Sequence, residues 1–385
     1  MSLPTPEFIP RDPQVIISEM VADYEARTGR TLEPAQVERL LINGFAYREL
    51  LLRNQIQDAA LQNLVAFARF PMLDYLGELV GVVRLPSQPA RTTLLLTLVT
   101  GHGDVVIPSG LRVSSTDGRA IFELIQDTEV LAADDTVEVI AVAQNNGELS
   151  NGYAIGTIST ILDPQPYLQT AENTTISESG SDEENDELLR DRIRLAPNSF
   201  STAGPYKAYE YWARTASPLI IDVAVDNRHY QSGDTIPSGY SIGDVIPGTV
   251  EVFPLVEGLT TTPPEILAAV ETILNADRIR PLNDVIFVTS PTAVDTDITV
   301  ELTLYDGAVQ ADILPIVQQN LEAFRDGRRK LLGQDIVISQ IKALCMIDGV
   351  YDADVTVPAS NLIIGATEFA NITDINVSVT GTNEG

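Results

Sequence analysis

The sequence contains a single cysteine, Cys345, among 385 residues. One thiol cannot form an intrachain disulfide or a thiolate metal cage. Histidine is almost as scarce, since His102 and His229 are the only two, and neither has a partner at metal-ligand spacing. We therefore predict no metal site. The apolar neighbours of Cys345 indicate a buried thiol that acts as a small hydrophobic residue.

Basic residues are also few, with 24 Lys and Arg against 54 Asp and Glu and a formal net charge of −30. Such a surface repels phosphate backbones, because nucleic-acid binding draws much of its affinity from basic contacts. We therefore expect no nucleic-acid partner. The charge fits simple solubility, and it fits equally well a self-repulsion that keeps copies apart until a partner offsets it.

Long apolar runs are absent, and none approaches the roughly 20 residues that a membrane span needs. The first residues also lack the basic and apolar stretches of a signal peptide. We expect a protein that does not insert into a membrane and that assembles in the cytoplasm where it is made.

Motifs for catalysis and cofactor binding are missing as well. The sequence has no G-x-S-x-G elbow, no phosphate-binding G-x-x-x-x-G-K-[ST] loop and no G-x-G-x-x-G fingerprint. The acidic run at residues 182–187 lacks the glycine and the final glutamate of an EF-hand loop. We predict no catalytic, cofactor-binding or metal-ligating residues, and we interpret the chain as a protein that is not an enzyme.

Residues 1–84 show a helical pattern. A first helix should begin at Asp12 and end at Gly29, and a second should run from Pro34 to about Phe67. The second would be about 50 Å long. Its apolar stripe consists of Val37, Leu41, Leu52 and Ile56. No other long helix nearby could cover this stripe, so we predict that it binds partner chains. Folding back onto the chain's own β domain remains the alternative.

Residues 85–165 change to short segments rich in β-branched residues, separated by Gly, Asp or Asn turns. This pattern predicts a small all-β module. The expected strands are Thr92–Thr100, Asp104–Ile107, Thr128–Leu131 and Thr136–Ala143. Between residues 90 and 162 the only aromatic residues are Phe122 and Tyr153.

The remaining sequence alternates helical and strand patterns, which predicts a central α+β domain at 166–260 and a C-terminal α+β domain at 261–385. Ser181–Glu184 and Thr262–Glu265 both have the form of a helix capping box. Residues 227–246 are polar and glycine-rich and should form a loop. The predicted fold class is therefore a multidomain α+β protein, with long N-terminal helices, a small all-β module and then α+β sandwich domains.

One basic cluster stands out in this acidic chain. It consists of Arg325, Arg328, Arg329 and Lys330. Two interpretations remain open. The cluster is either a charge set that the helix dipole favours at a C-terminus, or a docking patch for another acidic subunit.

Four groups of motifs follow one another in order along residues 73–358. They are Leu73–Gly77 with Gly81–Arg84; Val106–Val113 with Asp117–Phe122; Glu178–Glu183 with Glu187–Ile193, Ala203–Tyr206, Tyr209, Ile221–Val223 and Pro247–Val250; and Ile347–Val350 with Val357–Pro358. Together they resemble the baseplate J-like family of phage tails and contractile injection systems. The family often has Gly-Gly where this chain has Ser179-Gly180, and loop 227–246 is longer than in simple members.

The resemblance implies a structural baseplate wedge subunit of a contractile tail or injection machine. Such a subunit would link wedges into a ring around the hub and relay the trigger for sheath contraction. Its expected partners are other wedge subunits, further copies of itself, the central hub or spike and sheath-proximal proteins. Its expected place is the baseplate of a virion or injection particle, assembled in the bacterial cytoplasm. A receptor- or carbohydrate-binding tail protein is the alternative.

Overall fold

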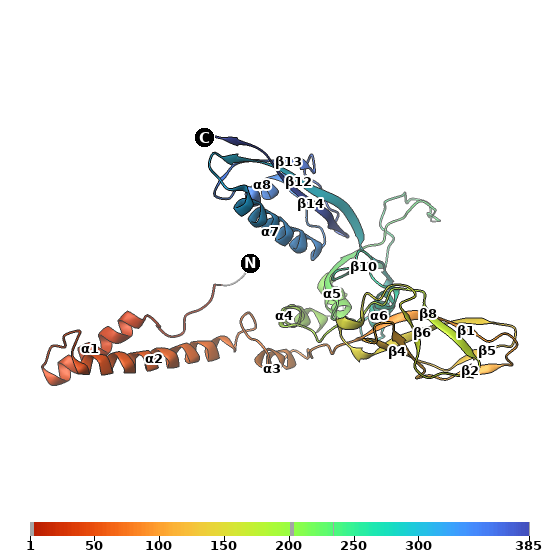
Figure 1. The fold of residues 1–385 in the computed structure, drawn as a ribbon, viewed down its shortest axis with the longest axis horizontal. Helices are drawn as coiled ribbons and strands as arrows, with labels where there is room; N and C mark the ends of the chain where they lie inside the picture. Colours follow the sequence, from red (N-terminus) through yellow and green to blue (C-terminus); the bar gives the residue numbers. More distant parts are fainter. Residues whose placement is uncertain (1–3, 201–203, 234, 385) are drawn as a thin grey trace. The chain divides into compact units, whose positions relative to one another are not determined.

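A computed structural model describes residues 4–200, 204–233 and 235–384. The chain separates into two compact units, one made of Met1–Val83 with Asn185–Arg194 and the other of Arg84–Glu184 with Leu195–Gly385. Helices occupy the N-terminal part and mixed helices and strands the rest, so the predicted α+β multidomain class is confirmed (Figure 1).

The first unit contains α1 (Pro13–Thr28), α2 (Val37–Leu61), α3 (Met72–Glu78) and most of α4 (Asp186–Leu195). The predicted ends of α1 are confirmed, because Asp12 accepts a hydrogen bond from the Gln14 amide and Gly29 adopts the left-handed conformation with φ of 67°. The predicted length of the second helix is wrong. Helix α2 has 25 residues, about 37 Å at 1.5 Å per residue.

The second unit begins with a nearly closed barrel. Its six-stranded antiparallel sheet has the order β7-β3-β4-β6-β1-β8, and the two end strands lie beside each other. The strands are β1 (Pro89–Leu98), β3 (Arg112–Ser115), β4 (Ile121–Leu124), β6 (Thr136–Asn146), β7 (Ile158–Ile161) and β8 (Leu168–Asn173), and a separate ladder joins β2 (Val105–Ile107) to β5 (Thr128–Val130). The four expected strands are present. Strands β3, β4, β7 and β8 were not predicted.

The central part contains α5 (Tyr206–Arg214), β9 (Ile220–Asp226), β10 (Thr249–Val256), α6 (Pro264–Leu274) and β11 (Val285–Val288). Strand β10 pairs antiparallel with β9 and parallel with β11. Neither predicted capping box forms. Asn185, rather than Ser181, accepts hydrogen bonds at the start of α4, and the Thr262 hydroxyl donates to the Pro254 carbonyl.

The C-terminal part contains β12 (Thr292–Tyr305), α7 (Gln310–Arg329), α8 (Ile338–Cys345), β13 (Val350–Val357) and β14 (Glu368–Asn383). Strand β12 lies between β13, which is antiparallel to it, and β14, which is parallel. Strand β14 was not predicted, since polar residues and Gly381 interrupt its alternation. Alternate β12 residues, among them Val300 and Leu302, belong to the same buried core as Val317 and Leu321 of α7.

Candidate assembly surfaces

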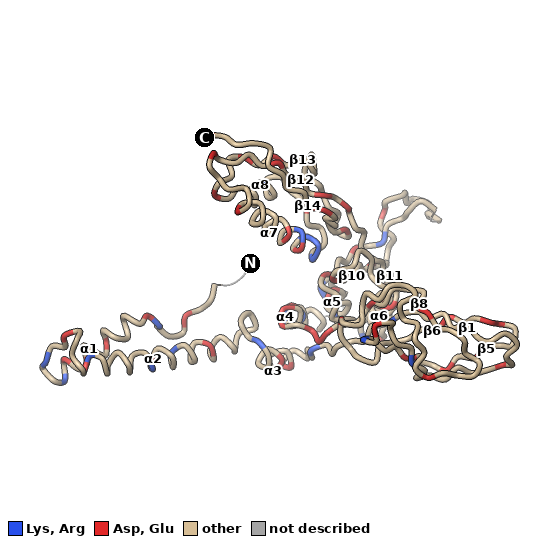
Figure 2. Tube along the Cα trace, in the orientation of Figure 1, with Lys and Arg blue, Asp and Glu red and all other residues tan. Residues whose placement is uncertain are grey.

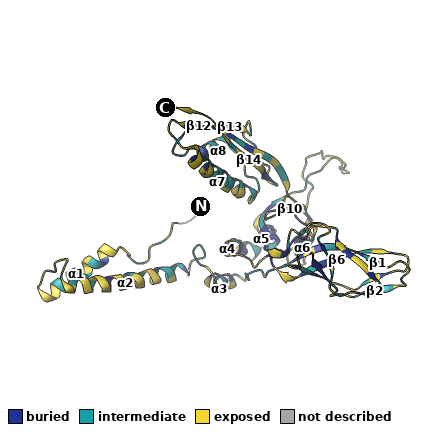
Figure 3. Ribbon diagram, viewed as in Figure 1, coloured by how far each residue is buried: buried dark blue, intermediate teal, exposed yellow. Residues whose placement is uncertain are grey.

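Helix α2 has two faces with different surroundings. Ala46 and Gln57 are buried on the face that meets α1 and the N-terminal segment, where the Gln57 side chain donates to the Pro6 carbonyl. The other face carries the predicted stripe, and α2 is coloured largely as exposed in Figure 3. The exposed fractions are 68% for Val37, 58% for Leu41, 58% for Leu52 and 53% for Ile56.

More large apolar side chains are exposed on α2 and extend this stripe. They are Leu40, Phe45, Tyr47 and Leu51. A contiguous apolar area of this kind on a single chain marks an interaction site. The stripe is therefore the strongest candidate for a partner-binding surface.

Helix α4 fixes the end of α2 through a buried arginine. Arg190 donates from Nε to the Val65 carbonyl at 2.8 Å and from Nη2 to the Ala68 carbonyl at 2.7 Å. These carbonyls belong to the turn that follows α2, so the arginine satisfies backbone groups that a continuing helix would bond. Arg190 also forms an ion pair with Glu187 of the same helix, at 2.6 Å. Arg190 thus joins the two sequence segments of the first unit.

The basic cluster lies at the end of α7 (Figure 2). Arg325 pairs with the adjacent Asp326, and Arg328 donates to the side chains of Gln334 and Gln340. Lys330 pairs with Glu257 of the central part, Nζ to Oε1, at 2.9 Å. Arg329 forms no ion pair within the described ranges. The cluster is therefore not a uniform cationic patch, and Lys330 already has a partner in the same chain.

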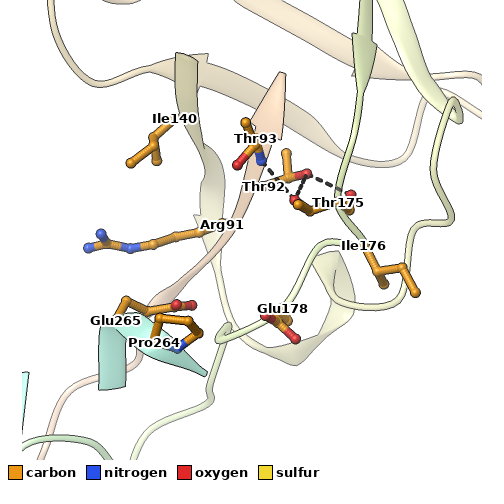
Figure 4. A pocket seen from close by; sticks show the side chains of 9 residues that line it. All are labelled: Arg91, Thr92, Thr93, Ile140, Thr175, Ile176, Glu178, Pro264 and Glu265. Carbon is orange, nitrogen blue, oxygen red and sulfur yellow. Dashed lines mark hydrogen bonds between the residues drawn. The ribbon is translucent and has the colours of Figure 1, made fainter. Parts of the chain in front are cut away.

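A pocket of about 250 Å³ lies where the barrel meets α6 (Figure 4). Arg91, Thr92 and Thr93 of β1 line it together with Ile140, Thr175, Ile176, Glu178, Pro264 and Glu265. Burial is the main cause that raises the pKa of the Glu178 carboxyl, and the negative charge of Glu265 raises it further.

Ser179, next to this pocket, is the one described residue other than glycine with a positive φ, 68°. This conformation costs an ordinary residue about 1–2 kcal/mol. The Ser179 hydroxyl donates a hydrogen bond to the Glu265 carboxylate, a contact that glycine could not make. The serine at a position where the family often has glycine could have drawn attention to Ser179. The sequence did not show that Glu265 is its hydrogen-bond partner.

The other chemically notable side chains, such as those of Cys345, His229 and His102, lie in different parts of the fold. Within the described ranges no group of three or more His, Cys, Asp or Glu residues could hold a metal ion, and no helix there is long and apolar enough to span a membrane. Cys345 is buried, and burial raises the pKa of its thiol to about 11. His229 lies in the predicted loop, where its ring contacts the Gly243 carbonyl. In the barrel, Phe122 is fully buried.

His102 joins two loops of the barrel. Its Nδ1 lies 2.6 Å from the Gly103 carbonyl and its Nε2 lies 3.1 Å from the Asp134 carbonyl. Both carbonyls only accept hydrogen bonds, so the imidazolium can donate to both of them, whereas the neutral ring can donate to only one. The hydrogen bond to Gly103 is the largest cause of a raised His102 pKa, and the charges of Asp135 and Asp104 add to it.

We expect the stabilisation from His102 to depend on pH. Because the folded-state pKa is raised, the contribution is fully present below the unfolded value of about 6.5 and is lost as pH rises through the folded pKa. The difference in unfolding free energy between the wild type and His102→Gln should shrink from pH 6 to pH 8. Proton NMR of the two histidine rings, assigned with this variant, should place the His102 midpoint above about 6.5. A midpoint at or below that value contradicts the prediction.

Comparison with known proteins gives matches along the chain. Four family models match in order: the Baseplate J-like N-terminal domain at residues 37–91, the barrel domain at 93–180, the central domain at 201–290 and the C-terminal domain at 296–378. The chain belongs to the Baseplate J-like family. This family membership makes it a structural baseplate protein, as the motifs along residues 73–358 predicted.

Two individual proteins are similar to this chain. Baseplate protein J of Escherichia phage P2 is 28% identical over 217 residues, which cover 56% of this chain and 66% of the phage protein, slightly less than two thirds of its length. A chain of the six-fold symmetrised cryo-EM structure of the anti-feeding prophage baseplate aligns with a TM-score of 0.39 and 11% identity, over 94% of this chain and 90% of that chain.

Proposed function

We propose that this Baseplate J-like protein is the wedge subunit that links neighbouring wedges into a ring around the hub. The observation that carries the proposal is the apolar face of α2, since Val37, Leu41, Leu52 and Ile56 are exposed in the single chain. An assembly that buries this face would remove a large apolar area from water, and this is the main driving force for stable association. The face would bundle with helices of other wedge subunits or of further copies.

The barrel and the two α+β parts would then contact neighbouring wedges, the hub or spike and sheath-proximal proteins, and relay the contraction trigger. We propose that this role involves no catalysis. The alternative of a carbohydrate-binding tail protein usually needs exposed aromatic rings. Of the two aromatic residues between 90 and 162, Phe122 is fully buried and Tyr153 packs partly buried against the barrel core. This arrangement favours the structural role.

We also propose that Arg328 and Arg329 help to orient a neighbouring acidic subunit as the ring forms. Exposed ion pairs contribute only about 0–1 kcal/mol each, so the effect should appear in encounter rate more than in final affinity. Arg328→Glu with Arg329→Glu should therefore slow ring assembly at low ionic strength. The difference should shrink at high salt, as the screening length falls from about 10 Å at 0.1 M to about 3 Å at 1 M.

Light scattering can follow assembly of the purified components at both salt concentrations, alongside melting of the isolated variant. If the two arginines serve only as a helix-end charge set, the variant should melt slightly lower and assemble at the normal rate. Normal assembly at low salt would reject the docking role. Arg325→Glu is the matched control, because Arg325 pairs with the adjacent Asp326.

A further inference from the structure

The central and C-terminal parts have separate apolar cores. One core gathers side chains between Tyr209 and Ile286, and the other gathers side chains between Ile298 and Ile375, with no residue in common. A pocket of about 550 Å³ lies where the two parts meet, and Lys207 and Asp222 line it from one side while Asp335 and Ile363 line it from the other. Parts that share no apolar core are expected to move relative to each other unless specific contacts hold them.

Two polar contacts cross this junction next to α7. Lys330 pairs with Glu257 at 2.9 Å, and both side chains are about half exposed, at 56% and 48%. Two residues further on, the Leu332 amide donates to Asp222 Oδ2 at 2.9 Å. Both contacts come from the segment that joins α7 to α8, so this segment is the bridge.

Residues of the central part hold the Asp222 side chain in position for this contact. Its Oδ1 accepts hydrogen bonds from Arg214 Nη2 at 2.9 Å and from the Val223 amide at 3.0 Å. Arg214 is buried and itself donates to the Ile221 carbonyl at 2.7 Å. The carboxylate therefore has a fixed orientation, with Oδ2 directed at the Leu332 amide. A fixed ionised acceptor makes a stronger hydrogen bond than a mobile neutral one.

We propose that Asp222, Glu257 and the segment Lys330–Leu332 form a releasable latch between the central and C-terminal parts. The latch consists of polar contacts beside a pocket that side chains do not fill. A partner that binds the open arrangement more tightly shifts the equilibrium by its difference in affinity. The latch is a property of the single chain, and the proposal does not depend on the wedge role.

Hydrogen exchange of two neighbouring amides in the full chain tests this proposal. The Leu332 amide is bonded across the junction, whereas the Gly333 amide donates to the Glu368 carbonyl inside the C-terminal part at 2.9 Å. Lys330→Glu should speed exchange at Leu332 by roughly two- to fivefold, the range expected for one exposed ion pair, and leave Gly333 unchanged. The charge swap Glu257→Lys with Lys330→Glu should restore the wild-type rate.

Arg325→Glu is the matched control, since it reverses a charge near the end of α7, and its ion pair with Asp326 does not cross the junction. It should leave both amides unchanged. In 1 M salt the wild-type Leu332 rate should approach that of Lys330→Glu, because screening weakens the exposed pair. An unchanged Leu332 rate in Lys330→Glu, or equal acceleration at Gly333, would overturn the latch.

Discussion

A chain that carries Leu41→Asp and Ile56→Asp is expected to be absent from assembled baseplates. Both side chains lie on the exposed face of α2. If partner helices cover this face, each substitution loses the burial of one large aliphatic side chain, about 1.5–3 kcal/mol. Each also places a charge in an apolar seam, which costs several kcal/mol more. A total loss of more than about 4 kcal/mol of binding free energy weakens association by roughly a thousandfold.

The same substitutions should not unfold the chain. Leu41 and Ile56 are more than half exposed and contribute little to the isolated protein, so its thermal melting should match the wild type. Incorporation is measured by quantitative mass spectrometry of particles purified from cells that produce the variant.

The control for this experiment is a pair of substitutions away from the stripe. Ala22→Asp and Ala26→Asp, both on α1, add the same two charges at exposed positions. These charges should leave incorporation unchanged. Normal incorporation of the Leu41→Asp, Ile56→Asp variant would show that the α2 face is not the bundling surface.

The second large effect is expected from Arg190→Ala. The arginine is buried and donates to the carbonyls of Val65 and Ala68. Its removal leaves two acceptors without their donor, and each lost hydrogen bond to a charged group costs about 1.5–3 kcal/mol. We expect the first unit to lose about 3–5 kcal/mol of unfolding free energy, measured by urea denaturation with a reporter in α2.

Arg194→Ala is the matched control on the same helix. Arg194 is about half exposed and, among the described residues, forms its ion pair with the exposed Asp191 at 3.3 Å, so its loss should change stability by at most about 0.5 kcal/mol. Arg190→Lys should recover only part of the stability, because an ammonium group lacks the fork that reaches two carbonyls. Equal stability of Arg190→Ala and Arg194→Ala would contradict the role assigned to Arg190.

Local signals in the sequence predicted the elements that depend on neighbouring residues. The cap at Asp12 and the left-handed Gly29 depend on backbone chemistry within a few residues, and each lies where it was expected. The apolar stripe of α2 was also predicted, since a helix of regular period places Val37, Leu41, Leu52 and Ile56 on one side. The ordered motifs were sufficient to predict the family.

The tertiary structure decided what depends on residues far apart in the sequence. The sequence showed Arg190 near acidic residues on one helix, but its carbonyl acceptors are more than 120 positions away. The same holds for Ser179 with Glu265 and for Asp222 with Leu332, which are also distant in sequence. Strand β14 was missed because its pairing with β12, rather than its own alternation, makes it a strand. Short-range patterns fix helices and turns, whereas hydrogen bonds between distant segments form only once the chain has folded.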